Sequence, residues 1–242
     1  HPSMKERAEK VGVKKTKAFN ELKKDIEKAM KSGRKIHILP PYRGDHNVFL
    51  ADLFSVSHHE TDQFVSKELI KAVVSLREVK DEHEIQEIEE AVDTAYLMHT
   101  TVMKMAYQGT WEREIAGMIE GIALAHGKGV SFPVILSMDG QTLHNHNHDN
   151  LLKEGRMVVT DAGAESLLHY ASDITRTVPV GGKFDTRQKE IYEIVLKANM
   201  ESIKAIKPGV SNRDLHLGAA EIIASGLKDL GFLKGDVAEI VR

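Results

Sequence analysis

The chain has 242 residues, of which 41% are hydrophobic and 29% charged, an ordinary balance for a soluble globular protein. A net charge of −3 does not suggest a nucleic-acid-binding surface, and the absence of cysteine excludes disulfides, thiolate metal ligands and thiol nucleophiles. No apolar run reaches the ~20 residues that a membrane-spanning helix needs, so we expect neither nucleic acid nor membrane among the partners.

The first part of the chain is predicted to be mainly helical. Residues 4–31 are rich in lysine and glutamate with apolar residues at helical spacing, which indicates one surface helix. Residues 35–39 predict a short buried strand, because they are apolar and precede two prolines. Residues 42–63 mix polar turns with short apolar pieces, and a further helix is predicted to begin near Lys67.

The charged stretch 77–81 is the predicted boundary between two domains, residues 1–76 and 77–242. Beyond it, helices are predicted at residues 81–107, 111–126, 186–206 and from Ser211 onwards. Buried strands are predicted at residues 132–137, 157–160 and 169–180. The order of helices, a mostly antiparallel sheet and then helices argues for an α+β fold.

Two aspartates stand at the ends of predicted strands. Asp161 follows an apolar strand, where a charge is costly unless it is paired or bound to a metal, and Asp173 precedes a β-branched run. If the two strands form a hairpin, the carboxylates converge and suit Mn²⁺, Mg²⁺, Co²⁺ or Zn²⁺. The alternative is that both aspartates simply cap turns, and the spacing alone favours that interpretation.

A longer motif around these aspartates favours the metal-binding interpretation over the turn-capping one. The segment DAGAESLLHYASDITRTVPVGGKF resembles the signature of creatinase-like, "pita-bread" peptidases, above all Xaa-Pro aminopeptidase (aminopeptidase P) and prolidase. The flanking segments VSFPVILSMDGQTLHNHNHDNLLKEGRMVV and DTRQKEIYEIVLKANMESIKAIKPGVSNRDL resemble the same family, so the resemblance covers residues 65–242. It implies the first half of an α+β pita-bread catalytic domain, preceded in residues 1–76 by the end of a smaller α/β N-terminal domain.

The resemblance also implies two divalent metal ions, Mn²⁺ in the first place and Co²⁺ or Zn²⁺ as alternatives. Asp161 is expected to ligate one metal and Asp173 to bridge both. Eleven residues separate the two aspartates, one more than the usual family spacing, and the loop at residues 165–170 is expected to absorb the extra residue.

Two further residues are assigned by the resemblance. His144 occupies the position of a histidine that helps to hold the substrate or a reaction intermediate, and Phe132 falls where the family places an aromatic residue near the substrate. Phe132 is equally well explained as a core residue. His144, His146 and His148 alternate, so on an extended strand they would face one side as a three-imidazole metal site, which is the less favoured alternative to a polar loop.

The family's remaining ligands are not found. No His-Gly-x-Gly-His motif follows the aspartates, and the chain opens with His1-Pro2-Ser3, so we expect a fragment of a longer peptidase. Two carboxylates alone bind a divalent ion weakly. We therefore expect this chain alone to show no measurable peptidase activity and only weak metal binding.

The function implied for the intact protein is metal-dependent hydrolysis of the bond between an N-terminal residue and a penultimate proline. Peptides with proline in second position are the expected substrates, in a cytoplasmic homodimer or higher homo-oligomer. The main alternative is a non-catalytic relative that binds peptides or proteins, but such relatives usually lose the aspartates. The two aspartates also argue against metal-free, creatinase-like hydrolysis. The sequence from Ser172 to Pro179 argues against a methionine aminopeptidase.

Overall fold

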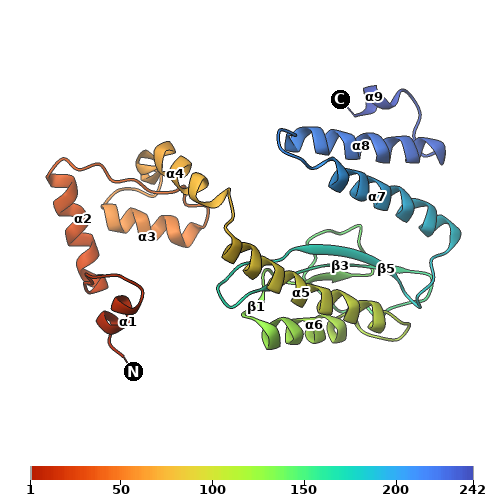
Figure 1. Ribbon diagram of the computed structural model, residues 1–242, viewed down its shortest axis with the longest axis horizontal. Helices are drawn as coiled ribbons and strands as arrows, with labels where there is room; N and C mark the ends of the chain where they lie inside the picture. The colour runs from red at the N-terminus through yellow and green to blue at the C-terminus, as the bar shows by residue number, and fades with distance from the viewer. Residues whose placement is uncertain (1, 242) are drawn as a thin grey trace. The chain divides into compact units, whose positions relative to one another are not determined.

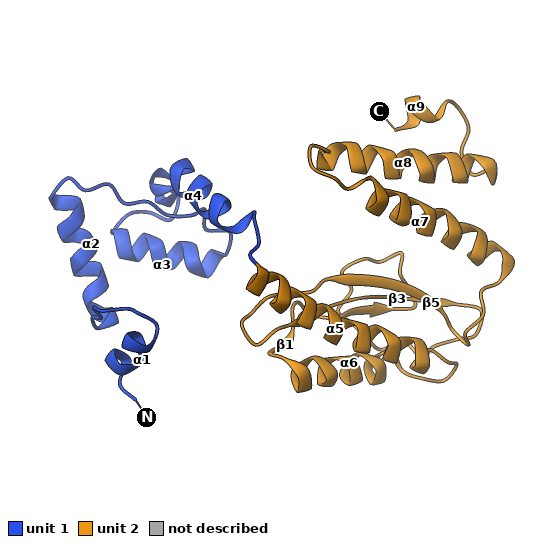
Figure 2. Ribbon diagram, viewed as in Figure 1, with its two compact units in different colours: residues 1–81 blue, residues 82–242 orange. Residues whose placement is uncertain are grey.

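The computed structural model describes residues 2–241 and divides into two compact units, His1–Asp81 and Glu82–Arg242 (Figure 2). The division falls at the end of the charged stretch 77–81. That residues 1–76 close a separate N-terminal domain stays a prediction. Within residues 2–241, none of the helices combines the length and the apolar character needed to span a membrane.

The first unit consists of short helices around a small apolar cluster. Its helices are α1 (Met4–Lys10), α2 (Leu22–Lys31), α3 (Gly44–Phe54) and α4 (Lys67–Arg77), with 3₁₀ turns η1 (Phe19–Glu21) and η2 (Thr61–Phe64). Leu50, Leu53 and Phe54 on α3 form the buried centre of this cluster. Leu22 and Ile26 of α2 pack against that centre from their own helix.

Three predictions for this unit were wrong. Residues 4–31 do not form one helix, because Gly12 adopts φ +77° and α1 ends at Lys10. Residues 35–39 do not form a strand: Ile38 makes a single β-bridge to Val65, too little pairing to extend. The irregular stretch expected at 42–63 contains α3, whose buried residues at 50, 53 and 54 follow helical spacing.

The second unit places two helices against one face of a small antiparallel sheet (Figure 1). Its helices are α5 (Glu82–Met105), α6 (Glu112–His126), α7 (Thr186–Ala205), α8 (Asn212–Asp229) and α9 (Val237–Ile240). Its strands are β1 (Gly129–Val130), β2 (Ile135–Ser137), β3 (Met157–Ala162), β4 (Ala164–Glu165) and β5 (Ile174–Pro179). The mixture of helices and an antiparallel sheet confirms the predicted α+β class.

Strand β3 is the centre of this arrangement. It pairs antiparallel with β2 on one side and β5 on the other, while β1 and β4 form a separate two-stranded sheet. Along β3 the side chains alternate: Val158, Thr160 and Ala162 are buried, and the residues between them are half-buried. The buried row belongs to the core formed with Met98 of α5 and Ile115 of α6.

The predicted helices of this unit are confirmed to within a few residues, and the strands less closely. Ser211 begins α8 as predicted, because its hydroxyl accepts a hydrogen bond from the amide of Asp214. The strand expected at 169–180 starts only at Ile174, because the preceding residues fold into a turn in which the Tyr170 amide donates to Ser166 Oγ. The strand expected at 132–137 starts at Ile135, since a bend precedes it.

Candidate metal centre

The pairing of β3 with β5 brings Asp161 and Asp173 to one place. Asp161 lies directly opposite Thr175 of β5, and Asp173 directly precedes that strand, two residues before Thr175. Because side chains two apart on a strand face the same side, both carboxylates project from the same face as diagonal neighbours. This is the face opposite to the one that α5 and α6 cover, so the carboxylates do not point into the core.

A close approach of two backbone segments sets where the two strands end. A Cβ atom on Gly163 would overlap the carbonyl oxygen of Ser172, so only glycine allows the two segments to lie this near. The hydroxyl of Ser131 donates a hydrogen bond of 2.7 Å to that same carbonyl oxygen. Ser172 Oγ accepts from the Ala164 amide at 3.0 Å and donates to the Ala91 carbonyl of α5 at 2.8 Å. The residue before Asp173 is thereby tied to β4 and to the helix behind.

A buried histidine supports the end of β3 from the core side. His99 of α5 is 4% exposed, and its Nε2 lies 3.1 Å from the carbonyl oxygen of Ala162. Burial lowers the pKa of His99, which favours the neutral ring, and a neutral ring protonated on Nε2 donates to that carbonyl. His99 therefore anchors the residue that follows Asp161.

The electrostatics of the Asp161–Asp173 pair favour a bound cation. Asp161 Oδ1 is buried without a hydrogen-bond partner within the described part of the chain. Burial, and then the neighbouring Asp161 carboxylate, raise the pKa of Asp173. A buried, unpartnered oxygen beside a second carboxylate is costly in isolation and fits a divalent cation, which prefers oxygen ligands. Among residues 2–241 no group of three or more histidine, aspartate or glutamate side chains could hold a metal ion, so no third side chain of these types joins the two carboxylates there.

The predicted substrate-side residues lie on a turn after β2 and on the bend between β1 and β2. His144 is exposed on a turn and adopts φ +59°, a conformation that non-glycine residues rarely take. Phe132 is half-buried at the bend between β1 and β2, next to Ser131 and its bond to the strand ends. Of the four residues predicted for the site, the structure brings Asp161 and Asp173 together; the roles of His144 and Phe132 stay predictions.

The three-imidazole alternative has no support in the structure. Residues 144–148 are not a strand, and the left-handed backbone at His144 breaks the alternation that would align the rings. His148 instead places Nδ1 3.1 Å from the carbonyl oxygen of Leu136. His144, His146 and His148 thus belong to a polar loop.

Sequence reasoning missed three residues that shape the centre: Gly163, Ser172 and His99. Gly163 and Ser172 lie inside the aspartate motif itself, so their position beside the aspartates was the available signal. The sequence contained no signal for His99, because a single histidine on the apolar face of a helix does not indicate which strand it contacts.

Comparison with known proteins agrees with this geometry. Residues 86–238, more than half of the chain, match the model of metallopeptidase family M24. A "probable Xaa-Pro aminopeptidase" of Chaetomium globosum is 34% identical over 218 residues, which cover 87% of this chain and 35% of that protein. A similarly named protein of Fusarium vanettenii is 37% identical over 182 residues, covering 74% of this chain and 39% of its own length. The chain thus spans well under half of these curated relatives.

Solved structures show the same fold. Zinc-substituted aminopeptidase P of Escherichia coli in complex with product superposes with a TM-score of 0.80 at 29% identity, over 97% of this chain and 55% of that one. Aminopeptidase PepP of Pseudomonas aeruginosa gives 0.80 at 27% identity with the same coverage. The pita-bread fold expected from the sequence is therefore confirmed, and the chain belongs to metallopeptidase family M24.

Proposed function

We propose that this chain is the part of an Xaa-Pro aminopeptidase that carries two of its metal-binding aspartates. The reaction is metal-dependent hydrolysis of the peptide bond between an N-terminal residue and a penultimate proline. The observation that carries the proposal is the placement of Asp161 and Asp173 on one sheet face, where Asp161 Oδ1 is buried and has no hydrogen-bond partner among residues 2–241. The names of the relatives support the same reaction.

The aspartates have distinct tasks in this proposal. Asp161 would ligate one divalent ion, and Asp173, the residue directly before β5, would contribute to holding both. When bound, the two ions lower the pKa of a water so that hydroxide is available near neutral pH, and they polarise the scissile carbonyl. The further ligands of such a site are expected in chain beyond these 242 residues. We take Mn²⁺ as the native metal, with Co²⁺ and Zn²⁺ as alternatives.

In this proposal His144, on the loop after β2, and Phe132, on the bend before β2, contact the substrate. His144 donates a hydrogen bond to the substrate or to the oxyanion of the tetrahedral intermediate, a role that its exposed ring allows. Phe132 offers an apolar surface to the substrate. Residues 1–76 belong to a separate N-terminal domain in this proposal, and the intact protein is a cytoplasmic homodimer or higher homo-oligomer.

Hydrolysis by the full-length protein tests the proposal. With Mn²⁺ added, the wild type is expected to cleave an Xaa-Pro peptide, and Asp173→Ala to lose that activity. Asp52→Ala is the matched control, because Asp52 is an exposed aspartate that pairs with Lys23 within the first unit. Equal activity in the wild type and Asp173→Ala would overturn the metal assignment. No activity in either would favour a peptide-binding relative.

A further inference from the structure

A buried glutamate lies between the two ends of the loop that carries His144. Glu112 is the first residue of α6 and is 0% exposed. Its Oε1 accepts a hydrogen bond of 2.6 Å from the amide of Met138, where the loop leaves β2. The side-chain amide of Asn150, where the loop ends, lies 3.1 Å from both carboxylate oxygens. One carboxylate thus joins both ends of the loop at residues 139–149.

The backbone on the far side of the loop is fastened to the same helix start. The Glu112 amide donates to the Asn150 carbonyl at 3.0 Å, and the Arg113 amide donates to the His148 carbonyl at 3.0 Å. Trp111 and Leu151 form an antiparallel bridge immediately beyond. These bonds hold residues 148–151 beside the start of α6.

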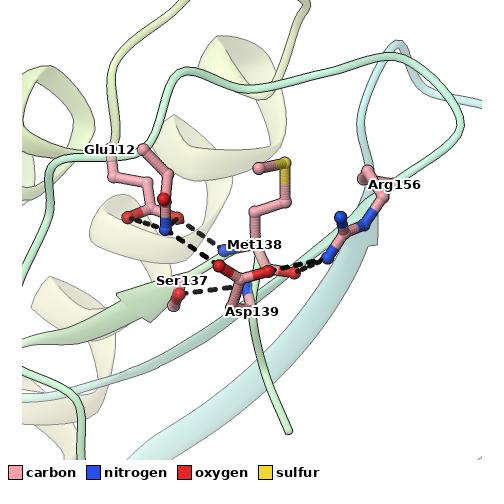
Figure 3. Close-up of polar contacts among 6 residues, drawn as sticks. Glu112, Ser137, Met138, Asp139 and Arg156 are labelled. Atoms are coloured by element: carbon pink, nitrogen blue, oxygen red, sulfur yellow. Dashed lines mark hydrogen bonds and ion pairs between the residues drawn. The ribbon is translucent and has the colours of Figure 1, made fainter. Parts of the chain in front are cut away.

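A second set of contacts braces the near side of the loop (Figure 3). Arg156 Nη2 donates to the Met138 carbonyl at 3.1 Å and to Asp139 Oδ1 at 2.8 Å. The Asp139 amide donates to Ser137 Oγ at 3.0 Å. Figure 3 shows Glu112 and Arg156 on opposite sides of Met138 and Asp139, so the loop leaves the sheet between two charged side chains.

The burial of Glu112 is unusual for its position. A glutamate in the first turn of a helix normally interacts favourably with the helix dipole while it stays in water, as the exposed Glu114 does. Glu112 is fully buried, and none of the ion pairs among the described residues involves it. Its charge is compensated by amide donors, and those donors come from the two loop ends.

We propose that Glu112 is a positioning residue that sets the geometry of the His144 loop, and the catalytic part of this inference rests on the proposed function of His144. A loop of this length with joined ends keeps its tip in place through the junction. A glutamine at 112 has the same shape but only one acceptor oxygen, so its NH₂ group must face either the Met138 amide or the Asn150 NH₂ group. In either orientation two hydrogen-bond donors face each other at one loop end, which weakens the junction.

Hydrogen exchange of the full-length protein tests the anchoring without any need for turnover. Glu112→Gln is expected to speed exchange of the amides at residues 139–149 by at least about tenfold, because an unmatched buried donor favours local opening. Glu120→Gln, the same substitution at an exposed position of α6, is the control and is expected to leave exchange unchanged. Unchanged exchange of the loop in a folded Glu112→Gln protein would overturn the proposal.

A double-mutant comparison tests whether the junction acts through His144. Glu112→Gln is expected to lower kcat/KM for an Xaa-Pro peptide by about tenfold in the wild type and to have little further effect in His144→Ala. Equal fold-losses in both backgrounds would show that Glu112 acts independently of His144 and would refute that link. If the wild type hydrolyses no such peptide, the proposed function fails while the exchange result still decides the anchoring.

A second variant covers the case in which Glu112→Gln does not fold. Asn150→Ala removes both side-chain bonds to the Glu112 carboxylate and the 3.4 Å bond to Asp139 Oδ2, and it keeps the bond between Glu112 and the Met138 amide. Faster exchange confined to residues 139–149 is expected. Exchange as slow as in the wild type would contradict the role of the junction.

Discussion

Replacing Gly163 by alanine adds a methyl group where two backbone segments touch. The new Cβ would overlap the carbonyl oxygen of Ser172. That carbonyl cannot move freely, because it accepts from Ser131 Oγ at 2.7 Å while Ser172 Oγ is bonded to the Ala91 carbonyl at 2.8 Å. The segment before Asp173 must therefore shift away from the end of β3, and the two carboxylates must separate.

The size of the effect follows from overpacking against fixed backbone. Inserting a methyl group into a well-packed place costs about 1–3 kcal/mol, and the rigid neighbour here argues for the upper part of that range. Alanine regains about 0.4–1 kcal/mol by reducing the freedom of the unfolded chain. The net destabilisation is then about 2 kcal/mol, which for a chain of this size lowers Tm by roughly 4–8 °C.

Thermal unfolding in EDTA measures this directly. Gly121→Ala is the matched control, since a Cβ at Gly121 meets no atom within 4 Å and the residue lies exposed on α6. It is expected to stabilise the protein by about 0.5–1 kcal/mol. In the full-length protein, Mn²⁺ should raise Tm for Gly121→Ala but not for Gly163→Ala. A Gly163→Ala protein with wild-type Tm and an intact Mn²⁺ response would refute the close approach.

Three further predictions concern charge and metal. Because the pKa of Asp173 is raised, the folded protein loses stability as pH rises from about 4 through that pKa. In urea unfolding without metal, Asp173→Asn is therefore expected to gain stability relative to the wild type over that rise, and a pH-independent difference would contradict this. The lowered pKa of His99 acts in the opposite direction, because the stability that the neutral ring contributes is present above about pH 6.5 and is lost as pH falls. The difference in unfolding free energy between the wild type and His99→Gln is therefore expected to shrink towards pH 5. A difference that stays constant with pH would contradict this. The 242-residue chain alone should bind Mn²⁺ weakly in calorimetry, because it brings together only two of the carboxylates, and a low-micromolar affinity would rule this out.

The fold of the second unit was largely readable from its sequence. The helical periodicity between residues 81 and 126 is a local pattern, and so are the apolar runs at the strands. Both can be read directly from the sequence. The strand boundaries were less accurate because turn chemistry decides them. Ser166 holds the residues before β5 in a turn, and nothing in their hydrophobicity indicates this.

The first unit was predicted less well for a related reason. The lysine-rich pattern of residues 4–31 continues across Gly12, but the positive φ of that residue ends α1. The apolar residues at 35–39 look like a buried strand, yet strand formation requires a partner, and Ile38 finds only Val65. Pairing of this kind is a property of the tertiary structure and is not visible in a window of the sequence.

For the candidate site, the motif identified the two aspartates but not the contacts that hold them. Gly163 had a visible place in the motif, while the need for glycine came only from the approach of Ser172. Glu112 looked like an ordinary first-turn acid of a helix. Its burial, and its bonds to Met138 and Asn150 at the two ends of a loop, are long-range features of the fold.

The location of bound manganese would show whether Asp161 and Asp173 are metal ligands. Crystals of the full-length protein grown with Mn²⁺ and measured for anomalous scattering would show where the metal lies. The account predicts two manganese ions, with Asp161 bound to one and Asp173 bridging both, and the loss of at least one ion in Asp173→Asn. Manganese bound elsewhere, with neither carboxylate among its ligands, would contradict it.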